Sequence, residues 1–241
     1  MQLQKTGAES LAALIDAWKH GQVHLPKVVR FTQYVGQNPR LRRQDTLAHV
    51  HGLALMCSIM LNRLSQHVPW LDKALFLQAV IVHDMGEGEL GNDVIFLKKS
   101  SERDLEEYLA FKARFIPLGE SDWMELQRAF LLQFADARSP CFPEEERAVM
   151  AELHRTKKYE AVLFSALESF DYLLYAAECF LDHGDGKVLY EVSGRQVPRL
   201  DEFAQRLPGF SEEVWTPQIR RWYVEFRASY ESSRQAKEAA V

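Results

Sequence analysis

The residues best suited to chemistry are His83 and Asp84, which follow a long apolar run at residues 75–82 and precede Met85-Gly86-Glu87. A histidine and an aspartate at the end of a buried helix are costly to desolvate unless another group compensates them. A divalent cation does so well, because neutral imidazole and carboxylate are common metal ligands. This pair therefore indicates a metal site.

Two further candidate ligands stand on other segments of the chain. His49 shares one face of a predicted helix with Leu53 and Met56, whereas His51 lies about 200° around that helix and should point away. Asp171 occupies an apolar stripe with leucines one turn away on both sides. A lone charge there should cost several kcal/mol, so it must be paired, protonated or bound to metal. A hydrogen-bonded core histidine and an arginine-paired aspartate remain the alternative interpretations.

The elements that must position these residues are helices. Apolar residues recur at helical spacing along most of the chain, and no stretch alternates convincingly with the period of a strand. Glycine and proline break the pattern between 184 and 209, which predicts a loop with short turns. The fold class is therefore all-α, with helices expected at about 9–20, 45–67, 71–84, 101–116, 120–135, 144–158, 159–183 and 211–231.

Composition narrows the class of protein. The 241 residues are 47% hydrophobic and 26% charged, as in an ordinary globular protein of one domain. A net charge of −5 argues against duplex nucleic acid as a partner. The three cysteines form no CxxC pair, and the chain shows neither a signal-peptide pattern nor an apolar run approaching 18 residues. We therefore expect a cytoplasmic protein with no membrane partner.

The order His49, His83-Asp84, Asp171 resembles the H…HD…D signature of the HD-domain metal-dependent phosphohydrolases. His83-Asp84-Met85-Gly86-Glu87 is similar to the HDxxE motif of the branch that contains the YfbR-type 5′-deoxynucleotidases. The resemblance covers about residues 30–185 of a single domain, 1–241, and leaves 186–241 as a C-terminal helical extension. It implies an HD-domain helical bundle whose four ligands hold one divalent ion of Mn, Co, Mg, Zn, Ni or Fe.

The resemblance also implies roles for residues near the ligands. Glu87 corresponds to a glutamate that orients or deprotonates the attacking water, although it could be a first-turn helix carboxylate. Arg42, seven residues before His49, and Lys98 match cations that bind the substrate phosphate. Their alternative interpretations are a solvated basic cluster and a surface lysine.

One departure from the branch lies in the segment after Glu87. The branch carries Gly-Asp five residues beyond that glutamate, where this chain has Gly91-Asn92 followed by Asp93. Either Asn92 takes the position and binds substrate, or the loop shifts by one residue and Asp93 becomes catalytic. Gly88 and Gly91 should permit the unusual backbone that such a shift needs.

The resemblance implies hydrolysis of a small phosphoester, best a nucleoside 5′-monophosphate, to nucleoside and phosphate; nothing in composition or spacing selects a nucleotide over another phosphomonoester. The rivals are a triphosphate or other phosphoester hydrolase on the same scaffold, and a regulatory protein that binds metal or nucleotide with little turnover. The C-terminal aromatic residues could pack on the bundle, close over the pocket or form a homodimer contact. These are Trp215, Trp222, Tyr223 and Phe226. The other histidines fit no ligand spacing and are expected to be packing or surface residues: His20, His24, His67, His154 and His183.

Overall fold

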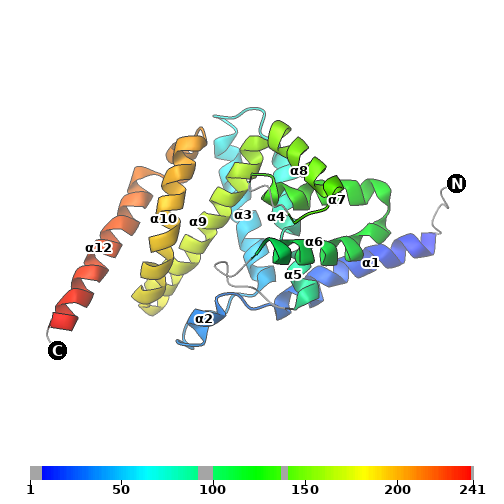
Figure 1. Ribbon diagram of the computed structural model, residues 1–241. Coiled ribbons are helices and arrows are strands. Elements are labelled where there is room, and N and C mark those ends of the chain that lie inside the picture. Colours follow the sequence, from blue (N-terminus) through cyan, green and yellow to red (C-terminus); the bar gives the residue numbers. More distant parts are fainter. Residues whose placement is uncertain (1–6, 92–99, 137–140, 240–241) are drawn as a thin grey trace. The chain divides into compact units, whose positions relative to one another are not determined.

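The computed structural model describes residues 7–91, 100–136 and 141–239, and these are overwhelmingly helical (Figure 1). Within these ranges there is no β-strand, and the one β-type pairing is an isolated antiparallel bridge between Val29 and Asp45. The prediction of an all-α protein is confirmed.

The chain forms two compact units, each assembled from separate segments. The first unit comprises Met1–Thr32, Arg43–Leu55 and Asp72–Ala161. The second comprises Gln33–Arg42, Met56–Leu71 and Val162–Val241. The segment expected as a C-terminal extension, 186–241, therefore belongs to a unit that also contains residues 33–42, 56–71 and 162–185.

The first unit is built on an aromatic core supplied mainly by two helices. Phe111 and Phe130 stack with ring centroids 4.4 Å apart, and Tyr108 and Trp123 pack around them. Ser100 begins one helix by accepting a hydrogen bond from the backbone N–H of Arg103. The helices of this unit are α1 (Gly7–Val23), α4 (Lys73–Val82), α5 (Met85–Leu90), α6 (Ser101–Phe115), α7 (Glu120–Leu131) and α8 (Glu144–Thr156), with short 3-10 turns at Leu25–Lys27, Ile116–Leu118 and Leu132–Phe134.

Two long helices begin in the first unit and continue into the second, α3 (Thr46–Leu64) and α9 (Lys158–His183). The Asp45 carboxylate accepts a 2.7 Å hydrogen bond from the N–H of Ala48, which confirms the predicted helix start. Of the helices described, α3 alone is long and apolar enough by composition to cross a membrane, with a mean hydropathy of 1.2. The core helix of a globular protein can have the same length and hydropathy, and 39% of the apolar stretch of α3 is buried.

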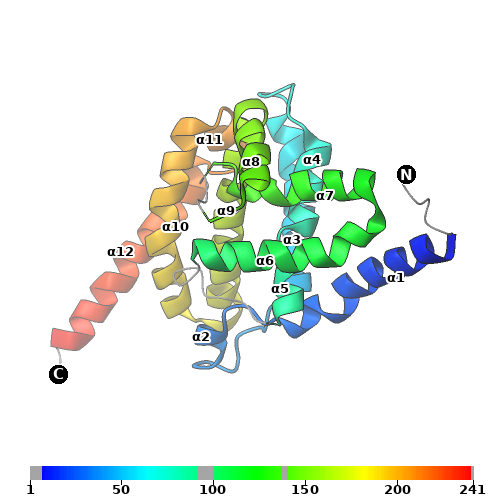
Figure 2. The ribbon, with the colours of Figure 1, turned by 45° about the vertical axis from the view of Figure 1, so that its right-hand side comes forward.

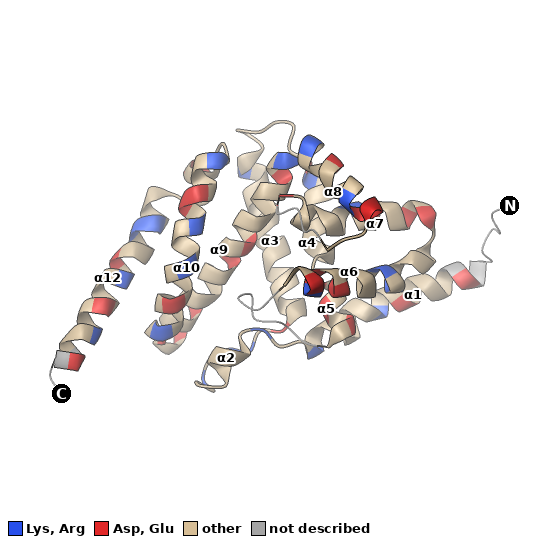
Figure 3. Cartoon of the chain, viewed as in Figure 1, with Lys and Arg blue, Asp and Glu red and all other residues tan. Residues whose placement is uncertain are grey.

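In the second unit, the helices α9, α10 (Gly186–Arg206) and α12 (Pro217–Ala239) lie beside one another (Figures 1 and 2). The short helices α2 (Thr32–Val35) and α11 (Phe210–Glu213) complete the described elements. Trp215 and Tyr223 are buried, and the indole of Trp215 donates to Asp201 at 2.8 Å. These two aromatic residues thus pack within their own unit. Charged residues of both signs are distributed along α10 and α12 (Figure 3).

The prediction of a loop at 184–209 was wrong, because most of that segment is α10. Asp185 caps the helix by accepting from the N–H groups of Lys187 and Val188. Pro198 lies inside α10 and removes the bond to the carbonyl of Gly194, normally a penalty of about 3 kcal/mol. Burial of an apolar stripe along the helix outweighs this penalty. The helical spacing of that stripe is the sequence signal that could have predicted α10: Val188, Leu189, Val192, Val197, Leu200 and Phe203.

Packing against α12 also explains the glycine in α10. A Cβ at Gly194 would lie 2.4 Å from Nη1 of Arg227, whose guanidinium donates to the carbonyl of Tyr190 at 2.6 Å. The C-terminal segment also differs from the single helix expected at 211–231. It consists of α11 and of α12, which extends to Ala239.

Candidate metal centre

Three of the four expected ligands converge inside the first unit. Nε2 of His49 lies 3.3 Å from Nε2 of His83 and 3.5 Å from Oδ2 of Asp84. His83 Nε2 lies 3.1 Å from the same carboxylate oxygen. All three side chains are buried, and they form a group that could hold a metal ion.

The local helix structure directs these three side chains toward one another. His83 and Asp84 occupy the junction between α4 and α5, as the break in the apolar run predicted. Asp84 is the N-cap of α5, yet its side chain makes no capping hydrogen bond and instead enters the cluster. On α3, His49 is fully buried and His51 is exposed, so the predicted register of this helix is correct.

The hydrogen bonds of His83 decide which nitrogen carries its proton. Its Nδ1 lies 2.8 Å from the carbonyl oxygen of Val80, and a carbonyl can only accept, so Nδ1 is the donor. In the neutral ring, Nε2 then carries a lone pair that faces the Asp84 carboxylate. A carbonyl that fixes the tautomer in this way is the usual outer partner of a metal-bound histidine.

The spacing of the three ligand atoms fits coordination of one cation. For metal–ligand bonds of about 2.1 Å, neighbouring ligands lie roughly 3.0 Å apart in an octahedron and roughly 3.4 Å apart in a tetrahedron. The observed separations of 3.1, 3.3 and 3.5 Å lie within about 0.1 Å of this range. Two imidazoles and a carboxylate suit zinc, iron, cobalt, nickel or manganese, and three protein ligands leave positions for water and substrate.

Arg30 also belongs to this site, although the sequence analysis did not single it out. Its guanidinium Nη1 donates to Oδ2 of Asp84 at 2.8 Å, and the residue is 4% exposed. The signal that could have found it is a charge inside the apolar run Val28-Val29-Arg30-Phe31. Such a charge must be paired if it is buried, by the same reasoning that marked Asp171.

The backbone around Arg30 is held in an uncommon conformation. The N–H of Arg30 donates to the carbonyl of Gln44 at 2.8 Å, and the N–H of Thr46 donates to the carbonyl of Val28 at 2.9 Å. The next residue, Phe31, has φ of 56° and is buried. A bulky residue at positive φ costs about 1–3 kcal/mol and is found mainly where surrounding structure enforces it, often near functional sites.

Burial by itself would raise the pKa of Asp84, but neighbouring His83, Arg30 and His49 outweigh it. They hold the pKa of this carboxyl well below its usual range. Asp84 is therefore ionised at neutral pH, as a metal ligand must be.

Glu87 lies in the first turn of α5, three residues after Asp84, and is 3% exposed. The N–H of Glu87 donates to the backbone carbonyl of Asp84 at 3.0 Å, so the two residues lie one turn apart at the start of α5. The Thr46 hydroxyl lies 3.4 Å from its Oε2 and is oriented to donate. Glu87 is thus a buried carboxylate beside the candidate metal ligands.

The glycines of this segment serve different purposes. Gly91 ends α5 with φ of 72°, the left-handed conformation that the sequence led us to expect. Gly88 does not have a positive φ; a Cβ there would lie 3.0 Å from Nε2 of His20. At Gly86, a Cβ would lie 2.2 Å from the backbone oxygen of Glu107. The absence of a side chain at Gly86 and Gly88 therefore allows α5 to pack closely against its neighbours.

The remaining predicted site residues lie elsewhere. Asp171 is in the second unit on α9 and is 8% exposed; its charge, after burial, helps to raise the pKa of the Cys57 thiol. Its role as fourth metal ligand stays a prediction. Arg42, also in the second unit, binds both carboxylate oxygens of Glu178 through two guanidinium nitrogens, and its phosphate-binding role likewise stays a prediction. The other three fall outside the described residues: Asn92, Asp93 and Lys98.

Comparison with known proteins adds no identification: no family model, curated protein or solved structure matches this chain.

Proposed function

We propose that this protein is a metal-dependent phosphohydrolase that acts on a small phosphate monoester. The observation that carries the proposal is the buried group formed by His49, His83 and Asp84, in which His83 is held with a lone pair directed at the other ligand atoms. A second acid, Glu87, and a buried arginine, Arg30, stand at the same junction. Hydrolysis of a phosphate ester requires these types of residue in one place.

Each residue has a distinct part in this proposal. His49, His83 and Asp84 would hold the cation, with Asp171 as the expected fourth ligand. A bound divalent ion would supply Lewis-acid polarisation of the phosphoryl group and a more acidic water. Glu87 would accept the proton of the attacking water. Arg30 would bind phosphate oxygens, since its planar guanidinium suits them and already lies 2.8 Å from a metal-ligand candidate.

The proposed substrate class is a nucleoside 5′-monophosphate, cleaved to nucleoside and inorganic phosphate. This choice rests on the resemblance of the H…HD…D order and the HDxxE motif to the deoxynucleotidase branch. The metal group itself would serve any accessible phosphomonoester. The nucleoside part of the proposal must therefore be tested separately from the hydrolysis.

The test is a screen for phosphate release with Mn²⁺, Co²⁺ or Mg²⁺ supplied in turn. The substrates are ribonucleoside and deoxyribonucleoside 5′-monophosphates, nucleoside triphosphates and sugar phosphates, and the control is the Asp84→Asn variant. We expect metal-dependent release from the monophosphates and background release by the variant. Release only from triphosphates or sugar phosphates would refute the nucleotidase part alone. No release from any substrate by metal-loaded protein would refute the phosphohydrolase.

A further inference from the structure

A second group of metal-ligating side chains joins α1 to α5, and the metal-dependent hydrolysis proposed above makes no use of it. His20 of α1 and His24, which directly follows α1, approach Glu89 of α5, and one ligand atom from each lies within 4.8 Å of those of the other two. His20 is 1% exposed, whereas His24 and Glu89 are half-buried. The sequence led us to expect both histidines as packing or surface residues. Their i, i+4 spacing continues the helical turn at the end of α1, where the N–H of His24 donates to the carbonyl of His20 at 3.0 Å.

The hydrogen bonding of His20 leaves one ring nitrogen available. Its Nε2 lies 2.8 Å from the carbonyl oxygen of Met85, which can only accept, so Nε2 carries the proton. Nδ1 lies 2.8 Å from Oε1 of Glu89 but finds no hydrogen-bond partner among the described residues. A buried nitrogen lone pair close to a carboxylate oxygen, without a proton between them, is unfavourable.

A cation between these groups would relieve this contact. Ligands that share one ion lie roughly 3.0 Å apart in an octahedron and roughly 3.4 Å apart in a tetrahedron when bonds are about 2.1 Å long. The 2.8 Å separation of His20 Nδ1 and Glu89 Oε1 is close to the octahedral value, and a tetrahedral ion would require these two atoms to move apart by about 0.6 Å. The Met85 carbonyl fixes the His20 tautomer in the same manner as the Val80 carbonyl fixes that of His83.

The surroundings of Glu89 allow an ion to reach it. A hollow of about 240 Å³ is lined by Asp16, Glu89 and Arg114, among other residues. Arg114 binds Oε1 of Glu89 through two nitrogens, at 2.7 and 2.6 Å, and also pairs with Asp16. Oε2 of Glu89 has no hydrogen-bond partner within the described ranges. The two carboxylates and one guanidinium leave one net negative charge beside two imidazoles, which favours a cation.

We propose that His20, His24 and Glu89 form a second divalent-cation site, with Zn²⁺ as the best-suited ion. Two histidines and a glutamate are a common zinc ligand set, and three protein ligands leave one position for water. The His20 ligand atom would be Nδ1, and Glu89 would bind through a carboxylate oxygen. The ion would tie α1 to α5, the helix that also carries Glu87 and begins at Asp84.

The test counts bound zinc and does not depend on hydrolysis. Protein stripped with a chelator is dialysed against Zn²⁺, and the equivalents per chain are measured by elemental analysis with the free ion known. We expect His24→Ala to bind one equivalent fewer than wild type, and His51→Ala, which removes an exposed histidine of α3, to bind as many as wild type. Glu89→Gln keeps the side-chain volume and should lower the affinity of the second site for Zn²⁺ about 10–100-fold.

The same count of bound zinc distinguishes the second site from the one formed by His49, His83 and Asp84. Asp84→Asn should lose the other equivalent, and the double variant Asp84→Asn with His24→Ala should retain neither. If His24→Ala and Glu89→Gln both keep the wild-type number of equivalents, while circular dichroism shows native helix content, the second site is refuted. If only Asp84→Asn keeps that number, the second site stands and the first metal centre is refuted.

Discussion

The two units of this protein differ in what they bury. The first unit encloses acidic, basic and imidazole side chains: His20, Arg30, His49, His83, Asp84, Glu87, Glu107, Glu146 and Glu160. In the second unit, the one buried charged residue among those described is Asp171. Because a buried charge is costly unless paired or bound to metal, the distribution separates a unit that must compensate many buried charges from one built chiefly on apolar packing.

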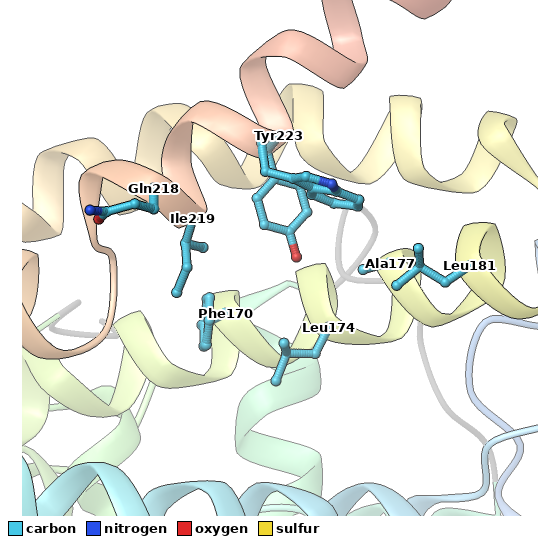
Figure 4. Close-up of a pocket in the computed structure, with 8 residues that line it drawn as sticks. Phe170, Leu174, Ala177, Leu181, Gln218, Ile219 and Tyr223 are labelled. Atoms are coloured by element: carbon cyan, nitrogen blue, oxygen red, sulfur yellow. The ribbon is translucent and has the colours of Figure 1, made fainter.

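A groove in the second unit illustrates the contrast. A groove of about 380 Å³ lies between α9 and α12, lined by Phe170, Leu174, Leu181, Ile219 and Trp222, among others (Figure 4). The hydroxyl of Tyr223, which also lines it, donates to the backbone carbonyl of Leu173 at 3.1 Å. A lining with so few polar groups offers little to hold a phosphate, which is consistent with the proposal that places the metal-dependent hydrolysis at the ligands of the first unit.

The largest effects on metal binding and phosphate release are expected from replacing one buried carboxylate in each unit. Asp84→Asn should abolish binding of the ion held by His49, His83 and Asp84, a loss of one equivalent, and reduce phosphate release to background, because it removes a ligand and the negative charge that faces Arg30. Asp171→Asn should do the same if Asp171 is the fourth ligand. The measurement is metal content together with phosphate release, and Asp182→Asn, an exposed aspartate of α9, is the control. Full metal content in Asp171→Asn would confine the centre to the first unit.

The next effect isolates catalysis from metal binding. Glu87→Gln should retain the metal but lower the rate of phosphate release about 10²–10⁴-fold, because the amide cannot accept the proton of the attacking water. The rate is measured with metal-saturated protein at matched metal content. An unchanged rate would remove Glu87 from the mechanism and leave it as a buried structural acid.

A third effect tests how closely α5 must pack. Gly86→Ala should lower the free energy of unfolding by about 3 kcal/mol, since the new Cβ would lie 2.2 Å from the Glu107 backbone oxygen. Gly52→Ala on α3 is the matched control: nothing lies within 4 Å of its Cβ, and it should gain about 0.4–1 kcal/mol. Both values come from chemical denaturation. Equal stability of the two variants would mean that α5 can move away from α6.

A fourth effect concerns a buried acid outside the metal centre. Burial raises the pKa of Glu146, but Lys112 and Tyr108, which donate at 2.9 and 2.8 Å, outweigh it and lower the pKa. A lowered pKa stabilises the fold above the unfolded value of about 4.3, and this stabilisation is lost as pH falls through the folded pKa. Glu146→Gln should therefore cost about 1.5–3 kcal/mol at pH 7.

The pH dependence provides the check on Glu146. The difference in unfolding free energy between wild type and Glu146→Gln should shrink below pH ~4, where the wild-type carboxylate becomes protonated. Glu145→Gln, at the exposed neighbouring position, should leave both stability and its pH dependence nearly unchanged. A cost that stays constant down to pH 3 would show that the ionised carboxylate contributes nothing.

The smallest effect lies in the second unit. Tyr223→Phe should cost about 0.5–1.5 kcal/mol, because it removes one buried hydrogen bond to the Leu173 carbonyl and leaves the ring packing intact. Tyr230→Phe, nearer the end of α12, should change stability by less. Thermal unfolding distinguishes the two variants. A cost above that of Glu146→Gln would mean that polar contacts matter as much in the second unit as in the first.

Sequence alone determined the elements whose signals are local. The apolar spacing of α3 placed His49 inward and His51 outward, Asp45 marked the start of that helix, and the end of the apolar run located His83-Asp84 at a junction. These features depend on residues within one or two turns of each other, so periodicity and capping suffice to predict them.

Only the tertiary structure decided which distant groups meet. Arg30 reaches Asp84 across 54 positions of sequence, and His49 meets His83 across 34 positions. Gly194 and Pro198 predicted a loop, yet packing of α10 against α12 stabilised a helix through them. The physical reason is the same in each case: the free energy comes from contacts between segments, which local propensity does not contain.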